Sequence, residues 1–345
     1  MNVRLRHPCI AARLFEHIQL TGILSALSLF LVAATPQAHA GNGSSADQGT
    51  EVVESEPQID FHVISTRICP QDGYSLCTPE QFDYYRLDEN NGWQSGDLAE
   101  FLSSLSPESP VSFFVHGNLV TWETAFQEGW QAANAMRSAA PAGSKLTVVM
   151  FTWESDRQSP LPGIDVEIKA ARADTTGFYL AQLLRKLSPK MSVSLVGHSH
   201  GARAVAGALQ LLSCGAVNGR ALPATHSPDM LPSIRVVFLA GTLDHDSLAP
   251  GKDYDGVLNS AEAVLNVRNS RDSILALYPL RMPFAESAIG KVGLRDRDWR
   301  RLGANQNRVQ QMDVADIIGN SHDWTSYFHA PGINASIAQY VYFSD

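Results

Sequence analysis

Short apolar runs alternate along the chain with longer amphipathic segments. The runs are rich in β-branched and aromatic residues and predict strands over residues 61–67, 111–115, 146–153, 192–196, 234–240, 263–267 and 309–314. The longer segments predict helices over residues 122–139, 165–187, 201–212 and 333–340. Several runs are continuously apolar, which is typical of strands covered on both faces. The order of strand, helix and strand therefore predicts an α/β fold, with a mostly parallel central sheet and helices on both faces.

The first forty residues have the pattern of a secretory signal peptide. Arg4, Arg6 and Arg13 precede an apolar run over residues 20–34, and an A-H-A triplet ends at Ala40. The apolar run has 15 residues, whereas a membrane span needs about 20. The sequence predicts cleavage after residue 40, export to the periplasm or the medium, and no stable membrane span after cleavage. The alternative is an uncleaved anchor.

Composition and charge narrow the class of the remaining chain. Residues 41–57 hold four acidic residues and no basic one, so we expect a disordered acidic leader there, followed by one large α/β domain over residues 58–345. The chain has 26 basic and 35 acidic residues, a formal charge of −9, and 44% hydrophobic residues. No basic stripe is present, which argues against a nucleic-acid partner.

Three cysteines follow the predicted cleavage site. Cys69 and Cys77 bracket a turn of Pro, Asp and Gly, and in an exported protein we expect them to form a disulfide. Cys214 follows an apolar run and is predicted to be a buried thiol. The chain has no C-x-x-C pair to support zinc binding or thioredoxin-type chemistry, and we expect neither a metal nor an organic cofactor.

The motif G-H-S-H-G at residues 197–201 follows an apolar run and precedes a helix rich in alanine. A serine held in a strained turn between a strand and a helix needs minimal side chains two positions before and two positions after it. Gly197 and Gly201 meet that need. The N-terminus of the following helix also offers N–H groups to a developing oxyanion. The pattern predicts Ser199 as a nucleophile and the backbone N–H of His200 as an oxyanion donor.

A second element, F-F-V-H-G-N at residues 113–118, is an apolar run that ends in His-Gly. In hydrolases with a nucleophile elbow, the second oxyanion donor is a backbone N–H in the loop after such a strand. We expect the Asn118 N–H to be this donor, with Leu119 as the next candidate. The alternative is a simple turn at the end of a strand, with a structural His116.

A serine nucleophile needs a base, and the base needs an orienting carboxylate. His322 lies in a polar loop directly after the last predicted strand and is the preferred base, with His329 in reserve. Asp272 follows the last-but-one strand and is favoured as the acid over Asp244, which follows the strand before it.

Together these segments resemble the α/β-hydrolase superfamily, and more narrowly a bacterial family of largely uncharacterised esterase- or lipase-like proteins. The resemblance spans residues 60 to 340 and is carried by six motifs: F-F-V-H-G-N at 113–118, F-T-W-E-S at 151–155, V-G-H-S-H-G at 196–201, F-L-A-G-T-L-D-H-D at 238–246, N-S-R-D-S-I-L at 269–275 and S-H-D-W at 321–324. It implies the α/β-hydrolase fold, with Ser199 as nucleophile, Asp272 as acid and His322 as base.

The sequence therefore predicts an exported serine hydrolase that cleaves carboxylic esters or thioesters through an acyl-enzyme intermediate, with a small-molecule acyl ester as its substrate. Peptidases and perhydrolases use the same triad, and a non-catalytic binding module with this fold is the alternative from another class. The long connection over residues 278–307 is either a partial lid or a surface insertion, and its mixed charges favour a solvated face.

Overall fold

The structure is a computed structural model that describes residues 55–71, 75–88, 90–223 and 230–344. The predicted signal peptide and residues 41–54 of the predicted leader lie outside these ranges. The strands are β1 (Gln58–Ser65), β2 (Asp83–Asp88), β3 (Gly92–Gly96), β4 (Val111–Val115), β5 (Lys145–Thr152), β6 (Ser192–His198), β7 (Ala216–Val217), β8 (Arg220–Ala221), β9 (Ser233–Leu239), β10 (Ala263–Arg268) and β11 (Val309–Asp313).

The helices are α2 (Leu98–Ser104), α3 (Trp122–Ser138), α4 (Pro162–Leu184), α5 (His200–Leu212), α6 (Val257–Ser260), α7 (Ile289–Val292), α8 (Asp296–Leu302), α9 (Ala315–Ile318), α10 (Trp324–His329) and α11 (Pro331–Val341). Short 3-10 helices η1 (Pro79–Gln81), η3 (Leu275–Arg281) and η4 (Gly303–Arg308) lie between them. No helix in the described part of the chain is both long enough and apolar enough to cross a membrane.

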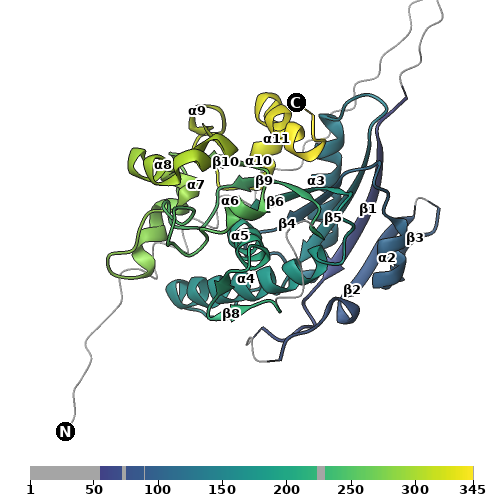
Figure 1. Cartoon of the computed structure of the whole chain (residues 1–345), viewed down its shortest axis with the longest axis horizontal. Coiled ribbons are helices and arrows are strands. Elements are labelled where there is room, and N and C mark those ends of the chain that lie inside the picture. Colours follow the sequence, from purple (N-terminus) through teal and green to yellow (C-terminus); the bar gives the residue numbers. More distant parts are fainter. Residues whose placement is uncertain (1–54, 72–74, 89, 224–229, 345) are drawn as a thin grey trace, which may run out of the picture.

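Within the described residues, the central sheet has nine strands in the order β11-β10-β9-β6-β4-β5-β1-β2-β3 (Figure 1). Neighbouring strands from β11 to β1 are parallel, while β2 and β3 add an antiparallel edge. The carboxyl ends of β4, β6, β9, β10 and β11 therefore meet at one edge of the sheet. In open parallel sheets, ligands bind at this edge.

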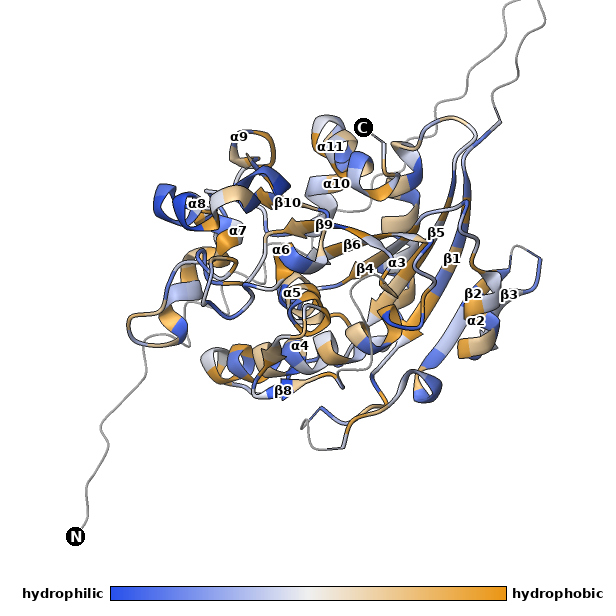
Figure 2. Ribbon diagram, viewed as in Figure 1, coloured by the Kyte–Doolittle hydropathy of each residue, from blue (hydrophilic) through white to orange (hydrophobic). Residues whose placement is uncertain are grey.

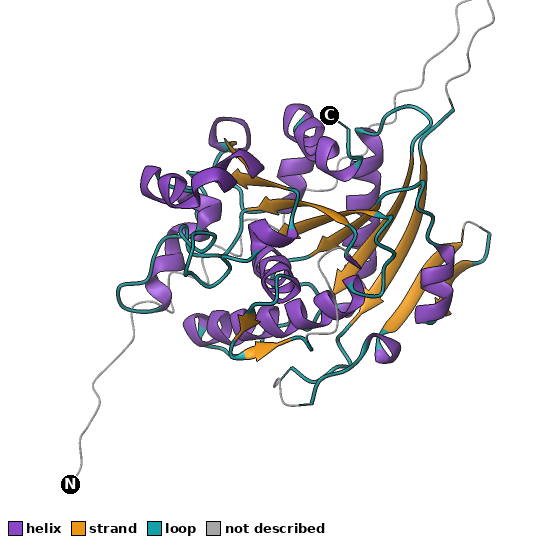
Figure 3. Cartoon of the chain, in the orientation of Figure 1, coloured by secondary structure: helices purple, strands orange, loops and turns teal. Residues whose placement is uncertain are grey.

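Helices cover both faces of the sheet (Figure 3). Along β4, Phe113 and Val115 face the core cluster shared with α4 and α5, whereas Phe114 faces the cluster shared with α3, α10 and α11. This alternation, with both faces apolar, explains why the central strands read as continuous apolar runs. In Figure 2 these strands are coloured largely as hydrophobic, whereas α8 is coloured as hydrophilic. The predicted fold class is confirmed.

Each predicted strand and helix has a counterpart whose ends differ from the predicted ends by at most three residues. The edge strands β2 and β3 were not predicted. Their residues are mostly exposed or half-buried, so the apolar runs that marked the central strands are missing from them. Short helices such as α7 and α8 were not predicted either, because four to seven residues make too few helical turns for a periodic pattern of apolar positions to appear.

The cysteine predictions have different outcomes. The disulfide between Cys69 and Cys77 is present, with 5.6 Å between the two Cα atoms, and this prediction is confirmed. The prediction of a buried Cys214 is wrong, because this thiol is exposed. Cys214 lies just beyond the end of α5 with a φ of 67°, so the chain has left the buried helix face when it reaches this residue.

The connection over residues 278–307 is more than a solvated insertion. Its backbone donates from Ile289 N to Leu243 O (2.7 Å) and from Gly290 N to Gly241 O (3.0 Å), and Asn269 N donates to Gly290 O (2.8 Å). Ile289 and Leu294 belong to the core, although Phe284 is fully exposed. The middle of the connection, around Ile289 and Gly290, thus packs between the loops that follow β9 and β10. The expectation of a solvated face holds for the turn around Phe284.

Candidate active site

Ser199 lies in a strained turn between β6 and α5, with φ 52° and ψ −119°. Glycines at both sides make this turn possible. A Cβ on Gly201 would lie 2.0 Å from the Val115 carbonyl oxygen, and a Cβ on Gly197 would lie 2.6 Å from the Ala202 Cα. Side chains at these positions would push the turn away from β4 and α5. The strain raises the serine above the sheet edge, as in a nucleophile elbow.

Three side chains from separate loops form a chain of hydrogen bonds at this edge. The Ser199 Oγ lies 3.1 Å from the His322 Nε2, and the His322 Nδ1 lies 2.7 Å from the Asp272 Oδ2. Ser199 follows β6, Asp272 follows β10, and His322 lies beyond β11. Since these strands are parallel neighbours or near neighbours, their carboxyl ends bring together residues up to 123 positions apart.

The acid is the most deeply buried of the three. Asp272 is completely buried, and its Oδ1 accepts hydrogen bonds from the backbone N–H groups of Ile274 (2.9 Å) and Leu275 (2.8 Å). The second oxygen, Oδ2, is thereby aimed at the imidazole. In this orientation the carboxylate can hold the imidazole and stabilise an imidazolium.

The alternative acid and base lie elsewhere. Asp244 pairs with Arg281 and accepts a hydrogen bond from the Tyr278 hydroxyl (3.1 Å), so it fastens η3 to the loop after β9. His329 is exposed at the end of α10. The structure therefore brings Asp272 and His322, rather than Asp244 and His329, to Ser199.

The loop after β4 lies against the serine. A Cβ on Gly117 would lie 3.1 Å from the Ser199 Cβ, so a glycine lets the backbone come this close without displacing the serine. Leu119, the second candidate donor, uses its N–H to bond the Ser155 carbonyl (3.0 Å). Within the described residues the N–H of Asn118 makes no backbone hydrogen bond.

His116 and Trp153 hold the start of this loop. The His116 Nδ1 donates to the Gly117 carbonyl (2.8 Å), and its Nε2 accepts from the Trp153 N–H (3.2 Å). The Trp153 indole stacks on the imidazole at 5.7 Å between ring centroids and donates from Nε1 to the His116 carbonyl (3.0 Å). Ser155 extends the contact by bonding both backbone groups of Val120. His116 thus has a structural role, as the alternative given in the sequence analysis expected for this residue.

Three histidines around the serine are buried, and burial lowers the pKa of His116, His198 and His200 to about 3 in each case. All three are therefore neutral at physiological pH. The His200 Nδ1 finds no hydrogen-bond partner within the described residues. The roles of His198, Trp153 and Ser155 were missed by sequence reasoning, although motifs quoted for the resemblance contain all three.

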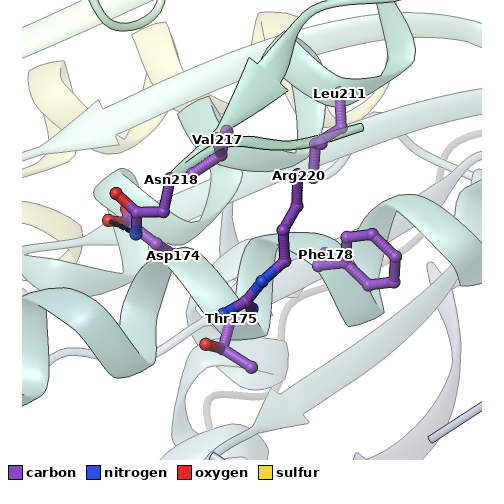
Figure 4. Close-up of a pocket in the computed structure, with 7 residues that line it drawn as sticks. All are labelled: Asp174, Thr175, Phe178, Leu211, Val217, Asn218 and Arg220. Atoms are coloured by element: carbon purple, nitrogen blue, oxygen red, sulfur yellow. Dashed lines mark hydrogen bonds between the residues drawn. The ribbon is translucent and has the colours of Figure 1, made fainter. Parts of the chain in front are cut away.

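Two hollows lie apart from the serine. One, of about 10 Å³, lies between α4, the end of α5 and the β7–β8 hairpin, and it is lined by residues that include Asp174, Asn218 and Arg220 (Figure 4). The other is an open groove of about 850 Å³ over α3, α10 and α11, lined in part by Trp324, Phe328 and His329. Neither is lined by Ser199, Asp272 or His322.

In the described part of the chain, no group of three or more His, Cys, Asp or Glu side chains is placed to hold a metal ion. The hydrogen-bonded chain of serine, histidine and aspartate is chemically suited to acyl transfer, because it joins a nucleophile to a base and the base to an orienting carboxylate.

One comparison with known proteins identifies the class. A family model described as "Alpha/beta hydrolase of unknown function (DUF900)" matches residues 93–320. No curated protein matches the chain. A solved structure of an acetyl xylan esterase, in an iodinated complex, aligns with a TM-score of 0.30 and 12% identity over 68% of this chain and 96% of that one. A likeness this weak supports no conclusion about the substrate.

Proposed function

The chain belongs to the alpha/beta hydrolase family whose model it matches over residues 93–320, and from this premise we propose that it is a serine hydrolase of carboxylic esters or thioesters. The observation that carries the proposal is the unbroken hydrogen-bond chain from Ser199 through His322 to Asp272. A serine with this pair of partners has the arrangement that activates a hydroxyl for attack on a carbonyl.

The proposed reaction has two halves. The Ser199 Oγ attacks the ester carbonyl while the His322 Nε2 takes its proton and then gives it to the leaving alcohol or thiol. Asp272 keeps the imidazole in the tautomer whose Nε2 is free to accept, and stabilises the imidazolium that forms. Water, activated by the same histidine, then attacks the acyl-enzyme and releases the acid.

The negative oxygen of the tetrahedral intermediate is to be held by the backbone N–H groups of His200 and Asn118. The former is the first N–H of α5, where helix geometry leaves donors without partners. The latter lies in the loop that Gly117 brings against the serine. Loss of one such donor costs about 3 to 4 kcal/mol of transition-state stabilisation in other serine hydrolases.

Export is part of the same proposal. We assign residues 1–40 to a signal peptide, residues 41–57 to an acidic leader and residues 58–345 to the hydrolase domain, with a final location in the periplasm or the medium. The disulfide between Cys69 and Cys77 is consistent with an oxidising compartment. Cleavage is tested by N-terminal sequencing of the exported protein, where a first residue of Gly41 is expected and a retained Met1 would contradict it.

A substrate panel tests the reaction. The purified protein is given acyl esters from short to long chain, matching thioesters and matching anilides, with Ser199→Ala as the control. We expect ester or thioester hydrolysis by the wild type and a loss of at least about 10⁴-fold in kcat for the variant. Equal rates in the two proteins would contradict the proposed nucleophile, and faster cleavage of anilides than of esters would favour a peptidase.

A further inference from the structure

The loop that carries His322 (residues 319–323, here the base loop) is anchored on one side to the loop after β10. The Asn269 Nδ2 donates to the Ser321 carbonyl (2.8 Å), and Asp272 holds the His322 imidazole. Both contacts come from the loop that supplies the acid. They therefore fix the histidine relative to Asp272. On the side of the nucleophile, the imidazole itself reaches the Ser199 Oγ (3.1 Å), and just beyond the loop Trp324 donates from Nε1 to Glu128 (3.2 Å).

A contact from the other side comes from His198, the residue just before the nucleophile. Its Nε2 lies 2.8 Å from the backbone carbonyl oxygen of His322. The two imidazole rings lie 5.1 Å apart, and the His198 side chain is buried. This hydrogen bond joins the nucleophile's own turn to the base loop across 124 positions of sequence.

The chemistry of this contact fixes the proton on His198. A carbonyl oxygen only accepts hydrogen bonds, so the Nε2 carries the hydrogen and the Nδ1 does not. The bare Nδ1 faces the loop after β4, where a Cβ on Gly117 would lie 2.9 Å from it. The ring is thus held between Gly117 and the base loop. Burial lowers the pKa of His198 to about 3, so it remains a neutral donor over the pH range in which a serine hydrolase works.

We propose that His198 is a positioning residue, which sets the distance between the Ser199 Oγ and the His322 Nε2 by holding the His322 carbonyl. This inference rests on the proposed function, because it concerns the same proton transfer. Without the hydrogen bond the base loop keeps its contacts to Asn269 and Asp272, so the acid–base pair survives while the base drifts from the serine. A misplacement of about 1 Å can cost about 100-fold in rate.

Two amide variants form a matched pair. The side-chain nitrogen of glutamine is four bonds from Cα, as is the Nε2 of histidine, so His198→Gln can still reach the His322 carbonyl. The side-chain nitrogen of asparagine is three bonds from Cα, at the position of the Nδ1, so His198→Asn falls short. Both variants are polar, neutral and smaller than the imidazole, and only one keeps the donor in place.

The test measures kcat, KM, the melting temperature and the rate of labelling by a fluorophosphonate probe for the wild type, both variants and Ser199→Ala. We expect His198→Asn to lower kcat and the labelling rate by about 10- to 100-fold, with KM within about twofold. We expect His198→Gln to recover most of that loss. The acid limb of the pH profile of kcat/KM should not move in either variant, because the contact between Asp272 and His322 remains.

The outcomes separate the two proposals. Labelling of Ser199→Ala at the wild-type rate would overturn the proposed function and this inference with it. If Ser199→Ala is inert, the inference alone is overturned by wild-type kcat in His198→Asn, or by an equal loss in both amide variants. An equal loss would mean that the imidazole acts by filling space. A fall in melting temperature shared by both variants, with kcat lost only in His198→Asn, supports the positioning role.

Discussion

The three buried neutral histidines around the serine make the stability of the fold depend on pH. The pKa of each is lowered by burial from 6.5 to about 3 in the folded state. In the unfolded chain these side chains regain an ordinary pKa. Below about pH 6.5 the unfolded chain therefore binds protons that the folded protein does not, and stability present at neutral pH is lost as the pH falls.

The size of the effect follows from the same values. Between pH 7 and pH 5, each histidine at 6.5 in the unfolded chain and about 3 in the folded chain costs about 2 kcal/mol of unfolding free energy. For His116, His198 and His200 together the loss is about 6 kcal/mol, against a total stability of about 5 to 15 kcal/mol for a typical protein. The pKa values of the half-buried Glu128 and of Asp83 are raised by burial, and these two carboxyl groups act in the opposite direction.

Urea unfolding of the disulfide-intact protein at pH 7 and pH 5 measures this loss. We expect the unfolding free energy to fall by about 6 kcal/mol and unfolding at pH 5 to take up about three protons. His200→Gln is the matched variant, because the His200 Nδ1 has no partner within the described residues. It should remove about one third of the pH dependence. A loss below about 2 kcal/mol in the wild type would refute the assignment of three buried neutral imidazoles.

Three further predictions concern single features. Asp272→Asn should lower kcat by about 10⁴-fold without unfolding the protein, since the imidazole loses its orienting anion. Asp244→Asn is the control and should keep kcat within a few-fold of the wild type. Steady-state assays of both variants test this assignment of the acid. Gly117→Ala should reduce kcat/KM by at least about tenfold, because the new Cβ would lie 2.9 Å from the His198 Nδ1 and 3.1 Å from the Ser199 Cβ. A variant with the kcat/KM of the wild type would show that this crowding does not affect the reaction. Replacing Cys69 and Cys77 by serine should cost about 2.5 kcal/mol in urea unfolding, and unchanged stability would show that the short loop is already ordered in the unfolded chain.

The sheet was predictable because its central strands are covered on both faces and therefore appear as apolar runs such as Val111–Val115. The residues of the candidate site could be proposed from the sequence for a related reason. Parallel strands deliver their carboxyl ends to one edge, so Ser199, Asp272 and His322 could be chosen by their place after successive strands.

The features that could not be predicted from the sequence depend on three-dimensional contacts, which leave no periodic pattern along the chain. A histidine that donates to the carbonyl of another residue, as His198 does to His322, looks like any other histidine before the loops are brought together. The place of Asp272 after the last-but-one strand favoured it over Asp244, but the contacts of the two carboxylates, with His322 and with Arg281, could not be read from the sequence. The exposure of Cys214 depended on where α5 ends, which is the least certain feature of a helical pattern.

Covalent labelling shows whether the Ser199 oxygen is the nucleophile. Trypsin cleavage after Lys190 and Arg203 releases a peptide of residues 191–203 that holds Ser192, Ser194 and Ser199. After reaction with a fluorophosphonate, fragmentation of this peptide in a mass spectrometer locates the adduct. We expect one phosphonyl group per chain, on Ser199, and none in the Asp272→Asn protein over the same time. An adduct on another residue, or no adduct on the wild type, would show that Ser199 is not the nucleophile.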